Sequence, residues 1–166
     1  MDEQIIRELS NVERLINNGD QRTAISKINK IITREPNCAQ AYFLKAEAQV
    51  CIPKIPLQEI ISNYQKAISL DTQNAEYYRS FGSFCLSIGN FDEAEKAYIK
   101  AAELDKENGP YYLSDFAIEY YHNATSKLDE AASNEQLDAI RKKTLLYFLK
   151  SLELEPEEAI KILQKK

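Results

Sequence analysis

Residues 74–108 read NAEYYRSFGSFCLSIGNFDEAEKAYIKAAELDKEN, and they decide the fold class of this chain. Apolar or small residues recur first at the i, i+3, i+4 and i+7 spacing of one helical face: Tyr78, Phe81, Gly82 and Cys85. Gly89 and Asn90 then interrupt the helix, because both tolerate the positive φ of a tight turn. A second helical face follows at Phe91, Ala94, Tyr98, Ala101 and Leu104. The stretch predicts two helices of about a dozen residues joined by a tight turn.

A copy of this hairpin precedes it. Its second-helix markers lie 34 residues before their counterparts and its first-helix markers 36 residues before: Tyr64, Ala67 and Leu70 in one helix, Tyr42 and Ala46 in the other. Two extra residues must therefore separate the helices of this copy. Pro53 and Pro56 lie between them, and we expect a longer turn there because proline ends helical geometry.

A weaker copy occupies residues 1–38. Gly19–Ala24 corresponds to Gly89–Ala94, and Pro36 follows its second helix. Its first helix, predicted from about Asp2 to Asn18, lacks the aromatic and small residues of the other copies. Degenerate ends are expected where a repeat array must be capped.

A longer copy begins at Gly109, with Tyr112 and Phe116 in the places of Tyr78 and Gly82. Its second helix is marked by Phe148, which lies 50 rather than 34 residues after Tyr98, so 16 residues are added. Helical apolar spacing continues through part of this insertion, at Tyr121, Ala124, Leu128 and Ala131. We predict about two extra turns on each helix of this hairpin. A loop over residues 124–133 is the alternative, because short polar side chains there can end a helix.

The second helix of this longer copy has its own start signal. Ser133 and Gln136 have the spacing of a capping box. Its predicted apolar face consists of Leu137, Ile140, Thr144, Leu145, Phe148 and Leu152. Residues 157–166 carry acids first and lysines last, which favours a short capping helix.

The sequence motif Y-x2-F-G…G-x-F-x-E-A-x3-Y-x2-A in residues 78–101 resembles the tetratricopeptide repeat. The resemblance implies one all-α domain over residues 1–166, an α-solenoid of about three and a half to four helical hairpins with a C-terminal cap. The segments are a degenerate repeat at 1–38, repeats at 39–74 and 75–108, an elongated repeat at 109–158 and the cap at 157–166. It also implies a right-handed superhelix whose concave wall is formed by the first helix of each repeat.

By the same resemblance, a partner peptide contacts side chains one and two positions after the packing aromatic, and a turn or more further on. The expected groove residues are Phe43, Leu44, Glu47, Val50, Arg79, Ser80, Ser83, Leu86, Leu113, Ser114, Ala117, Tyr120 and Tyr121. Arg79 is the single cation among them. Family members that bind the acidic tails of heat-shock chaperones use a lysine, asparagine and arginine clamp. The matching positions here include Phe43, Glu47 and Ser80, so we do not expect a chaperone-tail adaptor.

Composition excludes several classes of function. The chain has 21 basic and 26 acidic residues, a net charge of −5, without the concentrated basic face that nucleic-acid binding needs. No apolar run approaches the ~20 residues of a membrane span, and the N-terminus has no secretory signal. Cys38 and Cys51 fall near the two ends of one predicted helix, about 20 Å apart, too far for a disulfide. Three cysteines at unrelated positions indicate reduced thiols in a cytoplasmic protein.

Catalytic patterns are equally scarce. The four glycines serve turns, close packing and a repeat boundary, so no phosphate-binding loop remains. His122 is the only histidine and has no cysteine cluster near it in sequence, which disfavours a metal site. A nucleophilic pair of His122 with Cys85 or Cys51 would need a third group to orient the histidine, and the sequence suggests none. Asp115 and Glu119 have the i, i+4 spacing of an acid–base pair, but we favour a solvated or salt-bridged helix face for both carboxylates. We expect neither an enzyme nor a cofactor.

The sequence therefore predicts a protein-binding module, an adaptor or scaffold that holds a partner peptide or helix in its concave groove. Two alternatives remain open. One is a small secretion-type or assembly chaperone, and the other is a structural protein that self-associates into homo-oligomers through its terminal helices.

Overall fold

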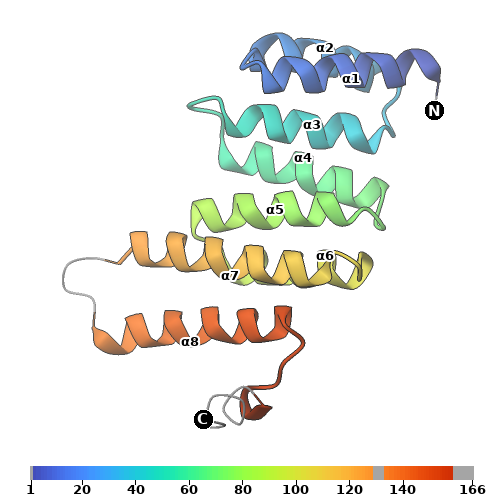
Figure 1. Cartoon of the computed structure of the whole chain (residues 1–166). Coiled ribbons are helices and arrows are strands. Elements are labelled where there is room, and N and C mark those ends of the chain that lie inside the picture. The colour runs from blue at the N-terminus through green and yellow to red at the C-terminus, as the bar shows by residue number, and fades with distance from the viewer. Residues whose placement is uncertain (1, 129–132, 159–166) are drawn as a thin grey trace. The chain divides into compact units, whose positions relative to one another are not determined.

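The computed structural model describes residues 2–128 and 133–158. Helices α1 to α8 account for most of them, and no strand occurs within these two ranges (Figure 1). The predicted all-α fold is confirmed. The chain divides into two compact units, Met1–Tyr77 and Tyr78–Lys166.

The first unit holds two helical hairpins and the start of a third. Its helices are α1 (Glu3–Asn17), α2 (Gln21–Arg34), α3 (Ala39–Val50), α4 (Leu57–Leu70) and the first turn of α5 (Ala75–Ile88). Helices α1, α2 and α3 pack on one another, and α4 packs on α3. The apolar faces of α1, α2 and α3, together with Cys38, form one buried cluster, made of Ile5, Leu9, Val12, Ala24, Ile28, Ile31, Cys38, Ala41 and Leu44.

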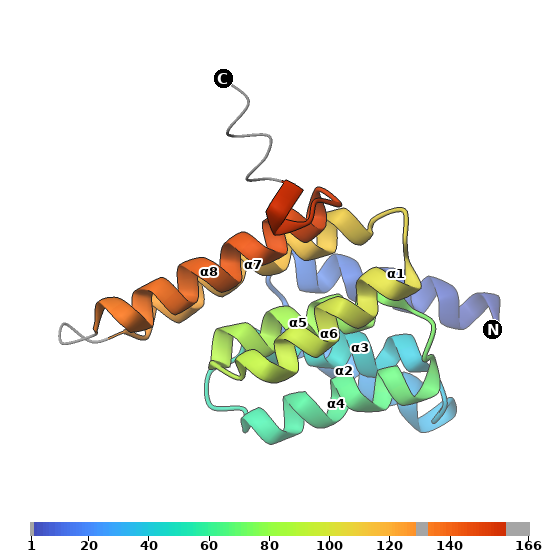
Figure 2. The ribbon, with the colours of Figure 1, turned by 90° about the horizontal axis from the view of Figure 1, so that it is seen from below.

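The second unit holds the rest of α5 with α6 (Phe91–Leu104), α7 (Gly109–Ser126) and α8 (Asn134–Ser151). Helix α7 packs on both α6 and α8. Figures 1 and 2 show α7 and α8 side by side as the longest hairpin of the chain. Pro156–Glu158 form one further helical turn, and residues 159–166 of the predicted capping helix lie outside the described residues.

The predicted turn and cap signals are confirmed. Gly19 and Gly89 have φ of 81° and 84°, the left-handed region that a glycine adopts without steric cost. The Ser133 side chain accepts from the backbone N–H of Gln136, whose side chain in turn accepts from the N–H of Ser133, a complete capping box. The chain is non-helical from 51 to 56, where the longer turn was expected.

A polar pair is buried between α3 and α4. The Asn63 amide donates to Oε1 of Gln49 at 2.7 Å, and Gln49 Nε2 donates to Glu59. Both amides are at least nine-tenths buried, and burying such groups without partners would be costly. The two side chains therefore fix how α4 sits against α3.

Gly82 is a close contact between α5 and α6. A Cβ at this position would lie 2.7 Å from Cδ2 and 2.9 Å from Cε2 of Tyr98, distances that real side chains do not reach. Tyr98 is fully buried, and its ring also packs against Phe116 of α7, with the centroids 5.5 Å apart. Glycine therefore lets α5 approach a large ring that α7 covers from another side.

Glu95 ties α6 to α8. Its two carboxylate oxygens accept hydrogen bonds from Lys143 and from the hydroxyl of Tyr147. Burial alone would raise the pKa of Glu95, but these two bonds and the charges of Lys143 and Lys150 outweigh it and hold the pKa below its usual value.

The insertion in the hairpin of α7 and α8 differs from the prediction. Helices α7 and α8 have 18 residues each, against 14 in α5 and α6, which is about one extra turn rather than two. Helix α7 ends at Ser126, so Leu128 is outside it, and residues 129–132, including Ala131, lie outside the described residues. Helical apolar spacing thus persisted in the sequence beyond the end of the helix.

The predicted apolar face of α8 is also partly wrong. Ile140 is buried as expected, but Tyr147 and Ser151 are the other buried residues of α8. Leu145 and Leu152 are 58% and 65% exposed. Tyr147 is drawn inward because its hydroxyl reaches Glu95 while its ring meets Phe116, with the centroids 4.5 Å apart.

Gly82→Leu is expected to lower the free energy of unfolding by about 1–3 kcal/mol, because the added side chain overlaps the Tyr98 ring and the backbones must move apart. Thermal and urea unfolding measure the change. The matched control is Ser87→Leu, at an exposed position of the same helix, which should change stability by no more than about 0.5 kcal/mol. Equal stability of the two variants would contradict the close contact.

Glu95→Gln is expected to destabilise the protein at neutral pH and to lose that effect in acid. The folded pKa of Glu95 lies below its unfolded value of about 4.3. Its stabilisation is therefore present above that value and is lost as the pH falls through the folded pKa. Unfolding midpoints of both proteins from about pH 7 to about pH 3 should converge. Glu103→Gln, which removes an exposed pair with Lys100, should show little difference at any pH.

Candidate functional site

Four of the expected groove residues lie on α3, in the first unit. Phe43 is half-buried, and its ring stacks on Tyr77 with the centroids 4.7 Å apart. Glu47 accepts a hydrogen bond of 2.5 Å from the Tyr64 hydroxyl. Val50 is 45% exposed, whereas Leu44 is buried in the core cluster. Phe43, Glu47 and Val50 therefore present accessible atoms, and Leu44 does not.

Four more of these residues lie on α5, in the second unit. Arg79 and Ser83 are partly exposed, while Ser80 and Leu86 are buried. Arg79 forms an ion pair of 3.4 Å with Asp115 of α7. Arg79, the single cation among the expected groove residues, therefore has a carboxylate of α7 beside it.

The buried face of α7 repeats that of α5 at a spacing of 35 residues, not 34. Tyr112 matches Tyr77, Phe116 matches Phe81 and Tyr120 matches Cys85, all of them buried. Ala117, fully buried, then takes the place of Gly82. The pairing of Phe116 with Gly82 was one residue out of register. The sequence did contain one signal for the correct register. At a spacing of 35 residues, aromatic Phe116 matches aromatic Phe81, and small Ala117 matches small Gly82.

This shift changes which α7 residues are accessible. Ala117 and Tyr120 are buried and Leu113 is half-buried, so these three belong mainly to the core side. The accessible face is an apolar stripe with one serine, which we call the α7 stripe: Tyr111, Ser114, Ile118 and Tyr121. Of these, Tyr111 and Ile118 were missed from the sequence, although they are 58% and 49% exposed. The stripe corresponds at the 35-residue spacing to Glu76, Arg79, Ser83 and Leu86 of α5.

A polar cluster borders the α7 stripe. The Tyr98 hydroxyl lies 3.3 Å from Oδ2 of Asp115 and 3.2 Å from Oε2 of Glu119, and Arg79 pairs with the same Asp115 oxygen. The cluster joins α5, α6 and α7 and holds two acids against one cation. Burial, and then the charges of Glu119 and Asp115, raise the pKa of Tyr98, which Arg79 offsets only in part. The phenol therefore remains a hydrogen-bond donor.

Cys85 and His122, weighed above as a nucleophilic pair, differ in burial. Cys38, Cys51 and Cys85 are all free thiols. Burial raises the pKa of Cys85 to about 12, the opposite of the lowered value that a reactive thiolate needs. His122 is exposed and its ring contacts Tyr121, with the centroids 6.3 Å apart. Within residues 2–128 and 133–158, no group of three histidine, cysteine or acidic side chains is arranged to hold a metal ion.

None of the helices in the described part of the chain combines the length and the apolar character that crossing a membrane requires.

No protein-family model matches this chain, and none of the curated proteins compared with it matches. Solved structures do match. A crystal structure of MamA, a tetratricopeptide repeat protein, superposes with a TM-score of 0.67 and 24% identity, covering 92% of this chain and 79% of that one. A second MamA structure gives the same score and identity over 96% and 75%. The likeness shows the fold, helical hairpins of the tetratricopeptide type, and confirms the resemblance found in the sequence.

Tyr98→Phe is expected to lower stability by about 1–2 kcal/mol, because it removes the hydroxyl that hydrogen-bonds to two carboxyl groups only partly open to solvent. Denaturant unfolding checks the value. Tyr111→Phe removes the same atom from a residue that is 58% exposed, and it should leave stability unchanged. If Tyr98→Phe left the free energy of unfolding unchanged, the polar cluster would not hold α6 to α7.

Proposed function

We propose that this chain is a non-enzymatic protein-binding module and that the α7 stripe is its principal contact surface in the second unit. The observation that carries the proposal is the exposure of Tyr111, Ile118 and Tyr121 on one face of a helix whose opposite face is fully used in the core. Exposed apolar side chains that gather on one face mark interaction sites more often than scattered ones do.

The spacing of the α7 stripe suits a peptide segment. Its members fall at i, i+3, i+7 and i+10, so they form a continuous row along the helix. Tyrosine supplies a large apolar area together with a hydroxyl that can donate or accept, and tyrosines are common energetic anchors of interfaces. A row of this kind can hold the apolar face of a helix or the alternate side chains of an extended segment.

The polar cluster adds a charge preference. Asp115 lies four residues after Tyr111 and three before Ile118, so its carboxylate borders the stripe. The cluster has two acids and one cation, and its Arg79 is already paired with Asp115. We therefore infer that the partner segment combines apolar anchors with a lysine, an arginine or backbone N–H groups directed at Asp115 and Glu119.

The same repeat positions in the first unit are Phe43, Glu47 and Val50 on α3. They too combine apolar atoms with a carboxylate, and we include them as a second contact surface. Leu44, Ser80, Leu86, Ala117 and Tyr120 are left out of the proposed surfaces because they are buried. Three free thiols agree with a reducing compartment such as the cytoplasm, where we place the module.

One observation favours a second candidate, self-association. Leu145 and Leu146 of α8 and Leu152, the residue directly after it, are exposed, at 58%, 38% and 65%. A second copy covering this surface would make the protein a homo-oligomer. Light scattering at rising concentration tests this candidate, and Leu145→Asp should return any oligomer to the monomer.

Ile118→Asp is expected to weaken binding of the partner by about tenfold or more, because a charge replaces an apolar anchor at the centre of the stripe. Affinity capture followed by mass spectrometry identifies the partner, and titration calorimetry with that purified partner measures the loss. The matched control is Leu145→Asp, which also replaces an exposed aliphatic side chain with aspartate, on α8. Circular dichroism confirms that both variants remain folded. Full affinity in folded Ile118→Asp would exclude the α7 stripe, and a loss confined to Leu145→Asp would assign binding to α8.

A further inference from the structure

The first unit contains an open cavity that the proposed function does not use. It lies between α1 and α2, has a volume of about 460 Å³, and is lined by Glu8, Asn11, Lys27, Lys30 and Arg34. Cavities of this size hold ligands or side chains of a partner. Its lining has three cations and one acid, although the chain as a whole has a net charge of −5.

The cations come from one helix. Helix α2 has four basic residues, Arg22, Lys27, Lys30 and Arg34, and no acid along its 14 residues. Lys27, Lys30 and Arg34 are spaced i, i+3 and i+7, so they share one face and extend about 10 Å along the helix axis. A positive row of this length matches about three residues of an extended chain, which advances ~3.3 Å per residue.

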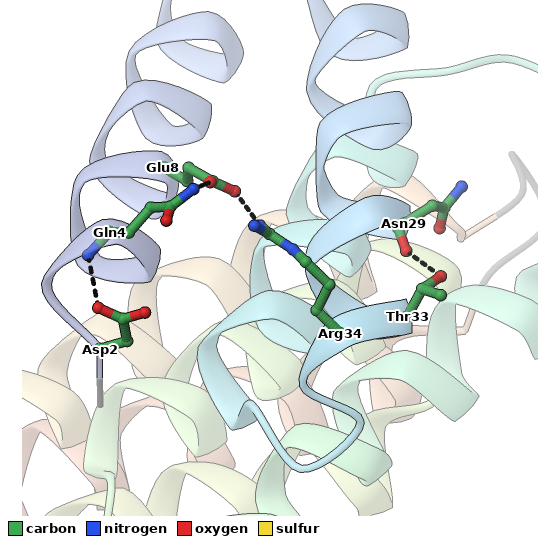
Figure 3. Close-up of polar contacts among 6 residues, drawn as sticks. All are labelled: Asp2, Gln4, Glu8, Asn29, Thr33 and Arg34. Carbon is green, nitrogen blue, oxygen red and sulfur yellow. Dashed lines mark hydrogen bonds and ion pairs between the residues drawn. The ribbon is translucent and has the colours of Figure 1, made fainter.

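The single acid of the cavity is already neutralised. Glu8 accepts from Nε2 of Gln4 at 3.0 Å and from the guanidinium of Arg34, which reaches across from α2 (Figure 3). The hydrogen bond from Arg34 is the main cause of the lowered pKa of Glu8. Burial acts in the opposite direction, whereas the hydrogen bond from Gln4 and the charge of Lys27 lower the pKa further. Glu8 therefore holds Arg34 against α1 and repels an incoming anion less than an unpaired carboxylate would.

The two lysines remain available. Within the described ranges 2–128 and 133–158, Lys27 and Lys30 form no hydrogen bond or ion pair, and both are exposed. Asn11 accepts from Arg14 at 3.1 Å through its side-chain oxygen, so its amide nitrogen is left to donate. The cavity thus offers two ammonium groups and an amide donor, with no unpaired acid in its lining.

We propose that this cavity between α1 and α2 binds an acidic peptide segment, with Lys27 and Lys30 pairing with its carboxylates. A compact phosphate fits the cavity less well, because phosphate sites converge several donors, often backbone N–H groups at a helix N-terminus, on one point. Here the cations are spread in a row, and the N-terminus of α2 is capped by Asp20 at the far end from Arg34. The site lies in the other unit from the α7 stripe and goes beyond the function proposed above.

The test uses the full chain and a fluorescein-labelled decapeptide of alternating glutamate and serine, followed by fluorescence anisotropy at low salt. Lys27→Gln combined with Lys30→Gln should weaken binding about tenfold, since each exposed charge pair contributes modestly. Arg7→Gln combined with Arg22→Gln removes the same charge outside the cavity and should change affinity by no more than about twofold. Glu8→Gln should tighten binding, because it removes the acid and releases Arg34, whereas mere damage to the hairpin would weaken it.

Several outcomes would overturn the proposal. An equal loss in the Arg7 and Arg22 control would show a diffuse charge effect rather than a site. Equal binding of a decapeptide with glutamine in place of glutamate would show that charge is not recognised. Binding of inorganic triphosphate without binding of the peptide would identify a small-anion site instead. Ile118→Asp should leave binding of the acidic decapeptide unchanged, so the failure of this site and the failure of the α7 stripe are distinguishable.

Discussion

The contact between Gly82 and the ring of Tyr98 is the constraint on which the second unit depends. No other residue type leaves room for this ring, since a Cβ would lie 2.7 Å from it. The buried ring meets Phe116, and its hydroxyl emerges beside Asp115 and Glu119. The glycine on α5 thus fixes the position of the Tyr98 ring, and through it the position of α7 and the carboxylates that border the α7 stripe. Core packing and the candidate contact surface are linked through a single tyrosine.

The α7 stripe and the cavity between α1 and α2 have opposite electrostatic character for a local reason. In the second unit, the polar cluster holds two acids against Arg79, which favours a partner with donors or cations. In the first unit, α2 lacks acids altogether, and Glu8, the acid in the lining of the cavity, is paired with Arg34. A chain of net charge −5 can therefore still carry a basic cavity, and recognition there and at the α7 stripe calls for different partner chemistry.

The repeat pattern alone predicted much of this architecture. The helical hairpins, the turns at Gly19 and Gly89 and the capping box of α8 were all expected, because each depends on residues close together in sequence. The candidate site was predicted less well. Phe43, Glu47 and Val50 have accessible atoms, as a contact surface requires, but on α7 the expected positions Ala117 and Tyr120 are in the core. A helical repeat of about 3.6 residues allows two helices to be aligned one position out of register. Because α7 was aligned in this way, Tyr111 and Ile118 were not among the expected groove residues.

By itself, then, the sequence determined the fold class, the order of the hairpins and most helix boundaries, since local spacing, glycine turns and caps act within a few residues of the chain. Only the tertiary structure decided the register of α7, the inward turn of Tyr147 and the pairing of Arg79 with Asp115. Each of these depends on a partner on another helix, such as Glu95 for Tyr147. A residue's periodicity shows that it can lie on a face, but the atoms that it meets there decide whether the face is core or surface.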